Sequence, residues 1–179
     1  MLLLISLLVE NKPGALMRVT GVLSARGYNI DSLTVARTLD PGLSRMTIVA
    51  DVEAVVRPQV IKQIQRLINV VQVVDLTDAQ VVCRELMLAK VQVSDEQKAT
   101  FLKEVEIFRA RVVDAAPGAY TVEITGDSEK LDAFIEVLQT YGEIEVIRSG
   151  AMALPRSTRE NKKKILSRER QGAVTSRRS

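Results

Sequence analysis

The sequence has 179 residues, contains no histidine and has a single cysteine, Cys83. This composition excludes a catalytic triad that uses histidine, a histidine-rich metal site and a disulfide within the chain. A Mg²⁺ site built only from carboxylates remains open. Hydrophobic residues make up 46% and charged residues 26% of the chain, which is ordinary for a globular protein of one or two domains.

The net charge of +3 is unevenly distributed along the chain. Residues 156–179 contain nine Lys or Arg and two Glu, a net charge of +7, which leaves −4 for residues 1–155. A basic segment can contact nucleic acid, an acidic partner or a membrane surface, and it can equally be a solvated chain end. Because this segment has no interleaved aromatic residues, we favour a flexible basic tail over residues 155–179.

The chain opens with an apolar run, MLLLISLLV. This run lacks the cationic start and the small-residue cleavage site of a signal peptide, and it is too short to span a bilayer. We therefore expect a buried strand at residues 2–9. No other segment approaches membrane length, and a lone thiol fits a reducing compartment, so we expect a cytoplasmic protein with no membrane segment.

Apolar periodicity in the first half predicts the order strand, helix, strand, strand, helix, strand. Gly27 is placed to stop the first helix, Asp40-Pro41-Gly42 forms a turn between two strands, and Pro58 suits the first turn of the second helix. The expected strands are residues 2–9, 29–37, 44–52 and 70–76. The apolar faces of the two helices are Leu16, Val19, Val22 and Leu23, then Val60, Ile61, Ile64, Leu67 and Ile68.

The same order returns in the second half, which predicts an α+β protein built as two consecutive ferredoxin-like βαββαβ sandwiches. We place the first domain at residues 1–77 and the second at residues 83–151. Each unit is small, so pairing of sheet edges would bury further surface. The expected strands are 85–93, 111–115, 120–125 and 144–147, and the helices carry Phe101, Leu102, Val105 and Phe108, then Leu131, Phe134, Ile135 and Leu138.

The turn before the first helix is the strongest candidate for a binding site. Amide N–H groups at a helix start have no partner within the helix and favour negative charge, and Gly14 would let a carboxylate approach them closely. The amides of Asn11 and Asn29 could hold both ends of an amino acid with an aliphatic side chain. Such residues are also common in turns that bind nothing, so the residues alone leave both interpretations open.

Two stretches of the first half resemble an ACT domain, a module that senses small molecules in amino-acid metabolism. They are Glu10-Asn11-Lys12-Pro13-Gly14-Ala15-Leu16 and Gly27-Tyr28-Asn29-Ile30. Further segments resemble the small, regulatory subunit of acetohydroxyacid synthase (acetolactate synthase), and the resemblance covers residues 1–155. These segments are residues 29–36, 43–48, 130–134 and 147–150.

The resemblance implies a function without catalytic residues, metal ligands or cofactors in this chain. In that family a large catalytic subunit holds thiamine diphosphate, Mg²⁺ and FAD and joins pyruvate to a second 2-keto acid. The small subunit is a homodimer that raises this activity and confers feedback inhibition, usually by valine held between two ACT domains. The residues that the resemblance assigns to the ligand, with Asn29 contributed across the dimer, are Asn11, Gly14, Ala15, Leu16, Asn29 and Ile30.

The second half departs from the ACT pattern, because it has neither a Pro-Gly turn before its first helix nor a Gly-Tyr-Asn-Ile sequence. We expect it to serve assembly or partner contact rather than ligand binding. The basic extension beyond Pro155 is also longer than this type of subunit requires. The preference among valine, leucine and isoleucine stays open, since one methylene discriminates only weakly.

Three other functions compete with that of a regulatory subunit. A stand-alone amino-acid sensor that acts on another protein or on transcription would use the same ACT residues. RNA binding is disfavoured, because strands 2–9 and 44–52 carry no aromatic residues and the body is net negative.

An enzyme is disfavoured because Asp31, Asp51 and Glu53 show no compelling spacing for acid–base work. We interpret Cys83 as a small apolar filler residue. Arg45 either contacts the large subunit or faces solvent.

Overall fold

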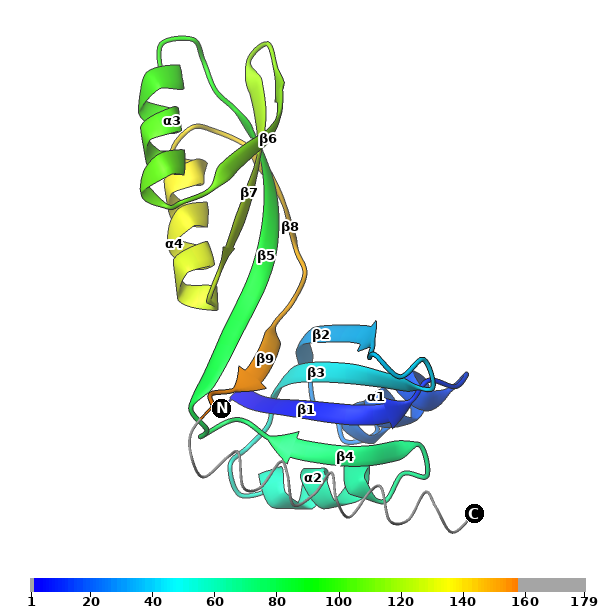
Figure 1. Ribbon diagram of the computed structural model, residues 1–179. Coiled ribbons are helices and arrows are strands. Elements are labelled where there is room, and N and C mark those ends of the chain that lie inside the picture. Colours follow the sequence, from blue (N-terminus) through cyan, green and yellow to red (C-terminus); the bar gives the residue numbers. More distant parts are fainter. Residues whose placement is uncertain (1, 158–179) are drawn as a thin grey trace.

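The computed structural model describes residues 2–157, which form two βαββαβ units in succession and so confirm the predicted fold class (Figure 1). The first unit contains β1 (Leu2–Glu10), α1 (Ala15–Ser24), β2 (Ile30–Arg37), β3 (Leu43–Asp51), α2 (Arg57–Gln65) and β4 (Val70–Asp75). The second contains β5 (Val81–Gln92), α3 (Lys98–Ile107), β6 (Arg111–Ala116), β7 (Ala119–Gly126), α4 (Ser128–Gln139) and β8 (Ile144–Arg148), and β9 (Met152–Pro155) follows.

The two sheets are antiparallel and share one strand order, β2-β3-β1-β4 in the first unit and β6-β7-β5-β8 in the second. The opening strand of each unit is therefore central, and β2 and β6 are edges. Two helices cover one face of each sheet, as α3 and α4 show beside β5 in Figure 1. The apolar run at residues 2–9 forms β1, whose Leu3, Ile5 and Leu7 are buried beneath the helices.

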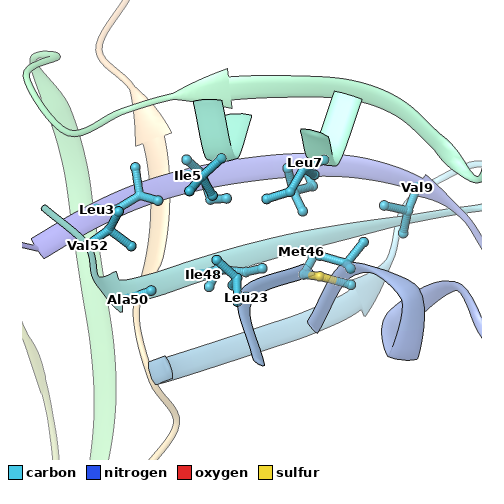
Figure 2. Close-up of a cluster of buried hydrophobic side chains, with 12 residues drawn as sticks. Leu3, Ile5, Leu7, Val9, Leu23, Met46, Ile48, Ala50 and Val52 are labelled. Carbon is cyan, nitrogen blue, oxygen red and sulfur yellow. The ribbon is translucent and has the colours of Figure 1, made fainter. Parts of the chain in front are cut away.

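The two cores differ in the kind of side chain that fills them. The first core is aliphatic, with β1, β3 and α1 contributing interlocking branched side chains (Figure 2). The second contains aromatic rings, and Phe101 packs with its ring centroid 5.2 Å from that of Tyr120 and 5.5 Å from that of Tyr141. A further pair, Phe108 and Phe134, has ring centroids 4.8 Å apart. One backbone plan thus accommodates two packing solutions.

The structure corrects three details of the sequence prediction. Strand β5 starts at Val81 rather than at residue 85, and β9, which pairs with the start of β5, was not predicted. Helix α2 ends at Gln65, so Leu67 and Ile68 lie beyond it. The side chain of Leu67 still packs against the core, whereas Ile68 is 83% exposed, because the chain turns there to enter β4.

Near the end of the described residues the chain returns to the junction between the two units. There the N–H of Arg156 donates to the carbonyl of Gln80 at 2.8 Å. The flexibility predicted for the tail concerns mainly residues 158–179, which lie outside the described residues.

Within residues 2–157, no helix is long and apolar enough to cross a membrane. That same part of the chain contains no group of three or more Cys, Asp or Glu side chains arranged to hold a metal ion.

Candidate functional site

Asn11 begins the turn between β1 and α1, and the hairpin between β2 and β3 holds it in place. Its N–H donates to the carbonyl of Gly42 at 2.8 Å, and its side-chain Nδ2 donates to the carbonyl of Pro41 at 3.0 Å. Asn11 as a whole stays exposed. The Asp40-Pro41-Gly42 turn therefore positions Asn11, a role that the sequence pattern does not reveal.

Gly14 is the N-cap residue of α1 and adopts a left-handed conformation, with φ 81° and ψ −8°. No side chain of the described residues caps this helix, and its first turn carries no acidic residue. A Cβ added at Gly14 would meet no atom within 4 Å, so the space in front of the helix is open. The helix start therefore offers amide N–H groups and a positive dipole end to an anion.

A small charge network lies beside this turn. Glu10 accepts hydrogen bonds from Asn69 Nδ2 at 2.8 Å and from Lys12 Nζ at 3.2 Å. These two interactions, the bond from Asn69 first, lower the pKa of Glu10. Arg18 of α1 donates to Asn69 Oδ1 at 2.9 Å. The network places two cations and one carboxylate near the helix start, a balance that favours an anionic ligand.

Ala15 and Leu16 take different positions on α1. Ala15 is 4% exposed and its N–H donates to the carbonyl of Lys12 at 3.2 Å, so its side chain belongs to the core. Leu16 is 43% exposed, and the next residue, Met17, is 75% exposed. The first turn of the helix therefore presents aliphatic surface beside its free amides.

Asn29 and Ile30 lie where the chain enters β2. Asn29 is exposed, its carbonyl accepts from the N–H of Asp51 at 3.0 Å, and its Nδ2 donates to Asp31 Oδ1 at 2.7 Å. This leaves the second side-chain N–H and the side-chain oxygen of Asn29 for other partners. Ile30 packs partly against the aliphatic core.

Asn11 and Asn29 lie at opposite ends of the first unit. The ladders place Ile30 and Leu3 opposite Ala50, whereas Asn11 follows Glu10, seven positions further along β1. At a rise of about 3.3 Å per residue, that separation is about 23 Å. One chain therefore does not bring the two amides around a single amino acid, and a site that uses both needs a second copy of the chain.

Arg45 and Cys83 form contacts within the fold. Arg45 Nη1 of β3 donates to Ser6 Oγ of the neighbouring strand β1 at 3.3 Å. Cys83 lies opposite Ala153 in the β5–β9 ladder. Burial, and secondarily the nearby charge of Glu85, raises the pKa of the Cys83 thiol. A raised pKa favours the neutral thiol and disfavours thiolate chemistry.

The sheet order and the open glycine turn define a protein with tandem ACT-like units. Two family models match the chain: one described as an AHAS small subunit-like ACT domain covers residues 5–72, and one described as the small subunit of acetolactate synthase covers residues 84–157. Together they span both units.

Curated relatives extend this match over most of the chain. A probable acetolactate synthase small subunit from Methanothermobacter thermautotrophicus is 46% identical over 87% of this chain and 94% of its own length. The acetolactate synthase isozyme 3 small subunit of Escherichia coli is also 46% identical, over 86% of this chain and 94% of its own length. The chain belongs to the acetolactate synthase small-subunit family.

A solved structure agrees with this assignment at the level of the fold. The crystal structure of the acetolactate synthase small subunit from Thermotoga maritima superposes with a TM-score of 0.80 at 36% sequence identity. The match covers 88% of this chain and 99% of that chain. Both βαββαβ units are therefore shared with a known member of the family.

Proposed function

We propose that this chain is the non-catalytic regulatory subunit of a cytoplasmic acetohydroxyacid synthase in branched-chain amino-acid biosynthesis. It activates a large catalytic subunit that carries thiamine diphosphate, Mg²⁺ and FAD, and it confers feedback inhibition by valine. The separation between Asn11 and Asn29 carries the proposal, because it fits a ligand held between two copies of the first unit. Family membership supplies the large subunit as the partner.

The proposed valine site combines the two ends of the first unit across a two-fold axis. In an isologous dimer, residue i of one copy meets residue j of the other, so the Gly14 turn of one chain faces Asn29 of its partner. The amides at the start of α1 receive the carboxylate, and the amides of Asn11 and Asn29 orient the polar groups. The exposed side chain of Leu16 contacts the isopropyl group of valine.

The edge of the first sheet supports a dimer of this kind. Strand β2 is an edge strand, and such strands leave backbone N–H and C=O groups unpaired. Val35 on this strand is 41% exposed, and Met17 on α1 is 75% exposed. We propose that these apolar side chains and the edge of β2 form the homodimer interface.

The proposal is tested by acetolactate formation with the purified large subunit alone, with this chain, and with this chain plus a few millimolar valine. We expect the chain to raise the rate and valine to lower it again. An unchanged rate, together with no association between the two proteins, contradicts the partner assignment. Valine at 100 times its Kd should also add about 2.7 kcal/mol to the stability of the chain if the site exists.

A further inference from the structure

Two of the sequence segments that resemble the family, residues 29–36 and 147–150, meet in space although they belong to different units. Ser32 Oγ of β2 accepts a hydrogen bond from the N–H of Ala151 at 3.1 Å. Thr34 Oγ1 of β2 donates to the carbonyl of Ser149 at 3.3 Å. We call this pair of bonds, together with the packing of Gly150 between them, the interdomain contact.

Gly150 fits the interdomain contact without spare room. A Cβ added there would lie 3.1 Å from Thr34 Oγ1 and 3.2 Å from Ser32 Oγ. The residue also has φ +79°, a conformation that side chains disfavour. Ala151, which follows it, is only 4% exposed. Side chains of the first unit thus contact the backbone of the second unit. A shift of β2 must therefore displace the segment at Gly150 or break its hydrogen bonds.

The segment that receives β2 is anchored firmly within the second unit. Ser149 exchanges hydrogen bonds with Leu86 of β5, donating its N–H at 2.9 Å and accepting through Oγ at 3.0 Å. Arg148, just before it, bonds to Glu85 of β5 at 2.8 Å and to Asp132 of α4 at 2.5 Å. A displacement at Gly150 therefore reaches both the central strand and a helix of the second unit.

The other end of the interdomain contact adjoins the proposed valine site. The ladder between β2 and β3 shifts register between Ile30 and Ser32, so Asp31 is an extra residue at a bulge. Asn29 donates to Asp31 Oδ1 at 2.7 Å, directly across this bulge. Bulges change the direction in which the following side chains point. A ligand that draws on the amide of Asn29 competes with its bond to Asp31, the residue next to Ser32, whose Oγ accepts from Ala151.

From this geometry we infer that the interdomain contact carries the valine signal from the first unit to the second. The inference rests on the proposed function and on the partner contact expected of the second unit, and it adds the route by which occupancy at Asn29 reaches that unit. Such a route separates the binding of valine from the inhibition that follows it. Loss of the contact removes the coupling between valine and activity while the site itself stays intact.

Two variants test the route. Ser32→Ala removes the acceptor for the Ala151 N–H, and Gly150→Ala introduces the Cβ that Ser32 and Thr34 exclude. The matched control is Gly118→Ala, because Gly118 has nearly the same φ, +74°, but no atom within 4 Å of an added Cβ. Valine binding to the full chain is measured by calorimetry, and activation and valine inhibition are measured with the large subunit.

We expect both variants to bind valine within about threefold of the unchanged chain and to activate the large subunit. The factor by which saturating valine lowers the rate of the complex should be about tenfold smaller for both variants, which is within the usual range of allosteric coupling. Gly118→Ala should be inhibited normally. Normal inhibition of Ser32→Ala overturns the inference. Loss of valine binding in parallel with inhibition also overturns it, since the contact would then support the site rather than the signal.

Hydrogen exchange on the unchanged chain tests the same route without a variant that could misfold. Valine should alter exchange at the Ala151 N–H and leave the Val93 N–H, which donates to Gly118 within the second unit, unchanged. Unaltered exchange at Ala151 in a chain that binds valine overturns the inference. A chain that neither binds valine nor activates the large subunit instead overturns the proposed function, so the two failures are distinguishable.

Discussion

The turn from β1 to α1 and the turn from β5 to α3 occupy equivalent places in two units with the same strand order, yet they differ in chemistry. The first ends in Gly14, with a left-handed backbone and open space in front of the helix. The second ends in Gln97, with a right-handed backbone, and is preceded by Asp95 and Glu96. The first turn favours a carboxylate and the second disfavours one. The proposed site therefore depends on the loop and not on the shared fold.

The largest expected effect separates the two units by stability. Phe134→Ala empties a fully buried position of the aromatic core, at a cost of about 3–5 kcal/mol. Urea unfolding followed by tyrosine fluorescence should show the second unit weakened, with valine binding retained. The matched change in the aliphatic core, Leu23→Ala, should weaken valine binding as well. Loss of valine binding in Phe134→Ala would show that the units do not fold independently.

Placing a carboxylate at the Gly14 turn tests its proposed role, and the β6–β7 turn at Gly118 serves as the control. Gly14→Asp brings a side chain and a negative charge to the position proposed for the carboxylate of valine. We expect a loss of about 2.7 kcal/mol in valine binding, or about 100-fold in Kd. Gly118→Asp carries a similar backbone strain, at φ +74°, and should bind valine normally. Unchanged valine sensitivity in Gly14→Asp would refute the site.

Removing one amide tests whether the far end of the first unit contributes to the site. Asn29→Ala deletes an exposed side chain whose Nδ2 donates to Asp31 Oδ1. We expect valine to bind about tenfold more weakly, the equivalent of one hydrogen bond of about 1.4 kcal/mol. Gln97→Ala, an amide deletion in the second unit, is the control. If Asn29→Ala also abolishes activation of the large subunit, Asn29 has a structural role.

The smallest expected effect is a pH dependence confined to the second unit. Burial, followed by the hydrogen bond to Glu104, raises the pKa of Tyr141 to about 12. In the unfolded chain the same hydroxyl has its ordinary pKa of 10.0 and ionises first as the pH rises. The free energy of unfolding should therefore fall by about 1 kcal/mol between pH 10 and 12, after allowance for solvent screening. Tyr141→Phe should reduce this loss when urea unfolding is compared at both pH values. An equal loss in both proteins would contradict the assignment.

The order of elements in both units could be predicted from the sequence because each depends on local patterning. A continuous apolar run marks β1, apolar alternation marks β5, and glycine or proline marks most of the turns. Strand β9 could not be predicted, because Met152–Pro155 is short, ends in proline and pairs with residues about 70 positions earlier in the chain. The apolar character of Ile68 predicts a place on the buried face of α2, yet the turn into β4 leaves this residue exposed.

The candidate site was predictable in its parts but not in its arrangement. Gly14 and Asn11 carry a recognisable turn signal, and the structure gives that turn an open helix start. The sequence does not show that Asn29 lies at the far end of the unit, because that distance follows from sheet register. The small residues Ser32 and Gly150 carry no signal for a contact between units, since only the packed structure brings them together.

Strand β5 also has a mechanical consequence. It runs unbroken from the ladder with β9 at the junction into the centre of the second sheet (Figure 1). Its 12 residues form an arm of about 40 Å at the usual rise of a strand. A tilt of about 5° at Val81 would swing Gln92 through about 3 Å if the strand stays straight over that length. Movements too small to disturb the packing at the junction are thereby magnified at the far tip of the molecule, where α3 and the β6–β7 hairpin lie.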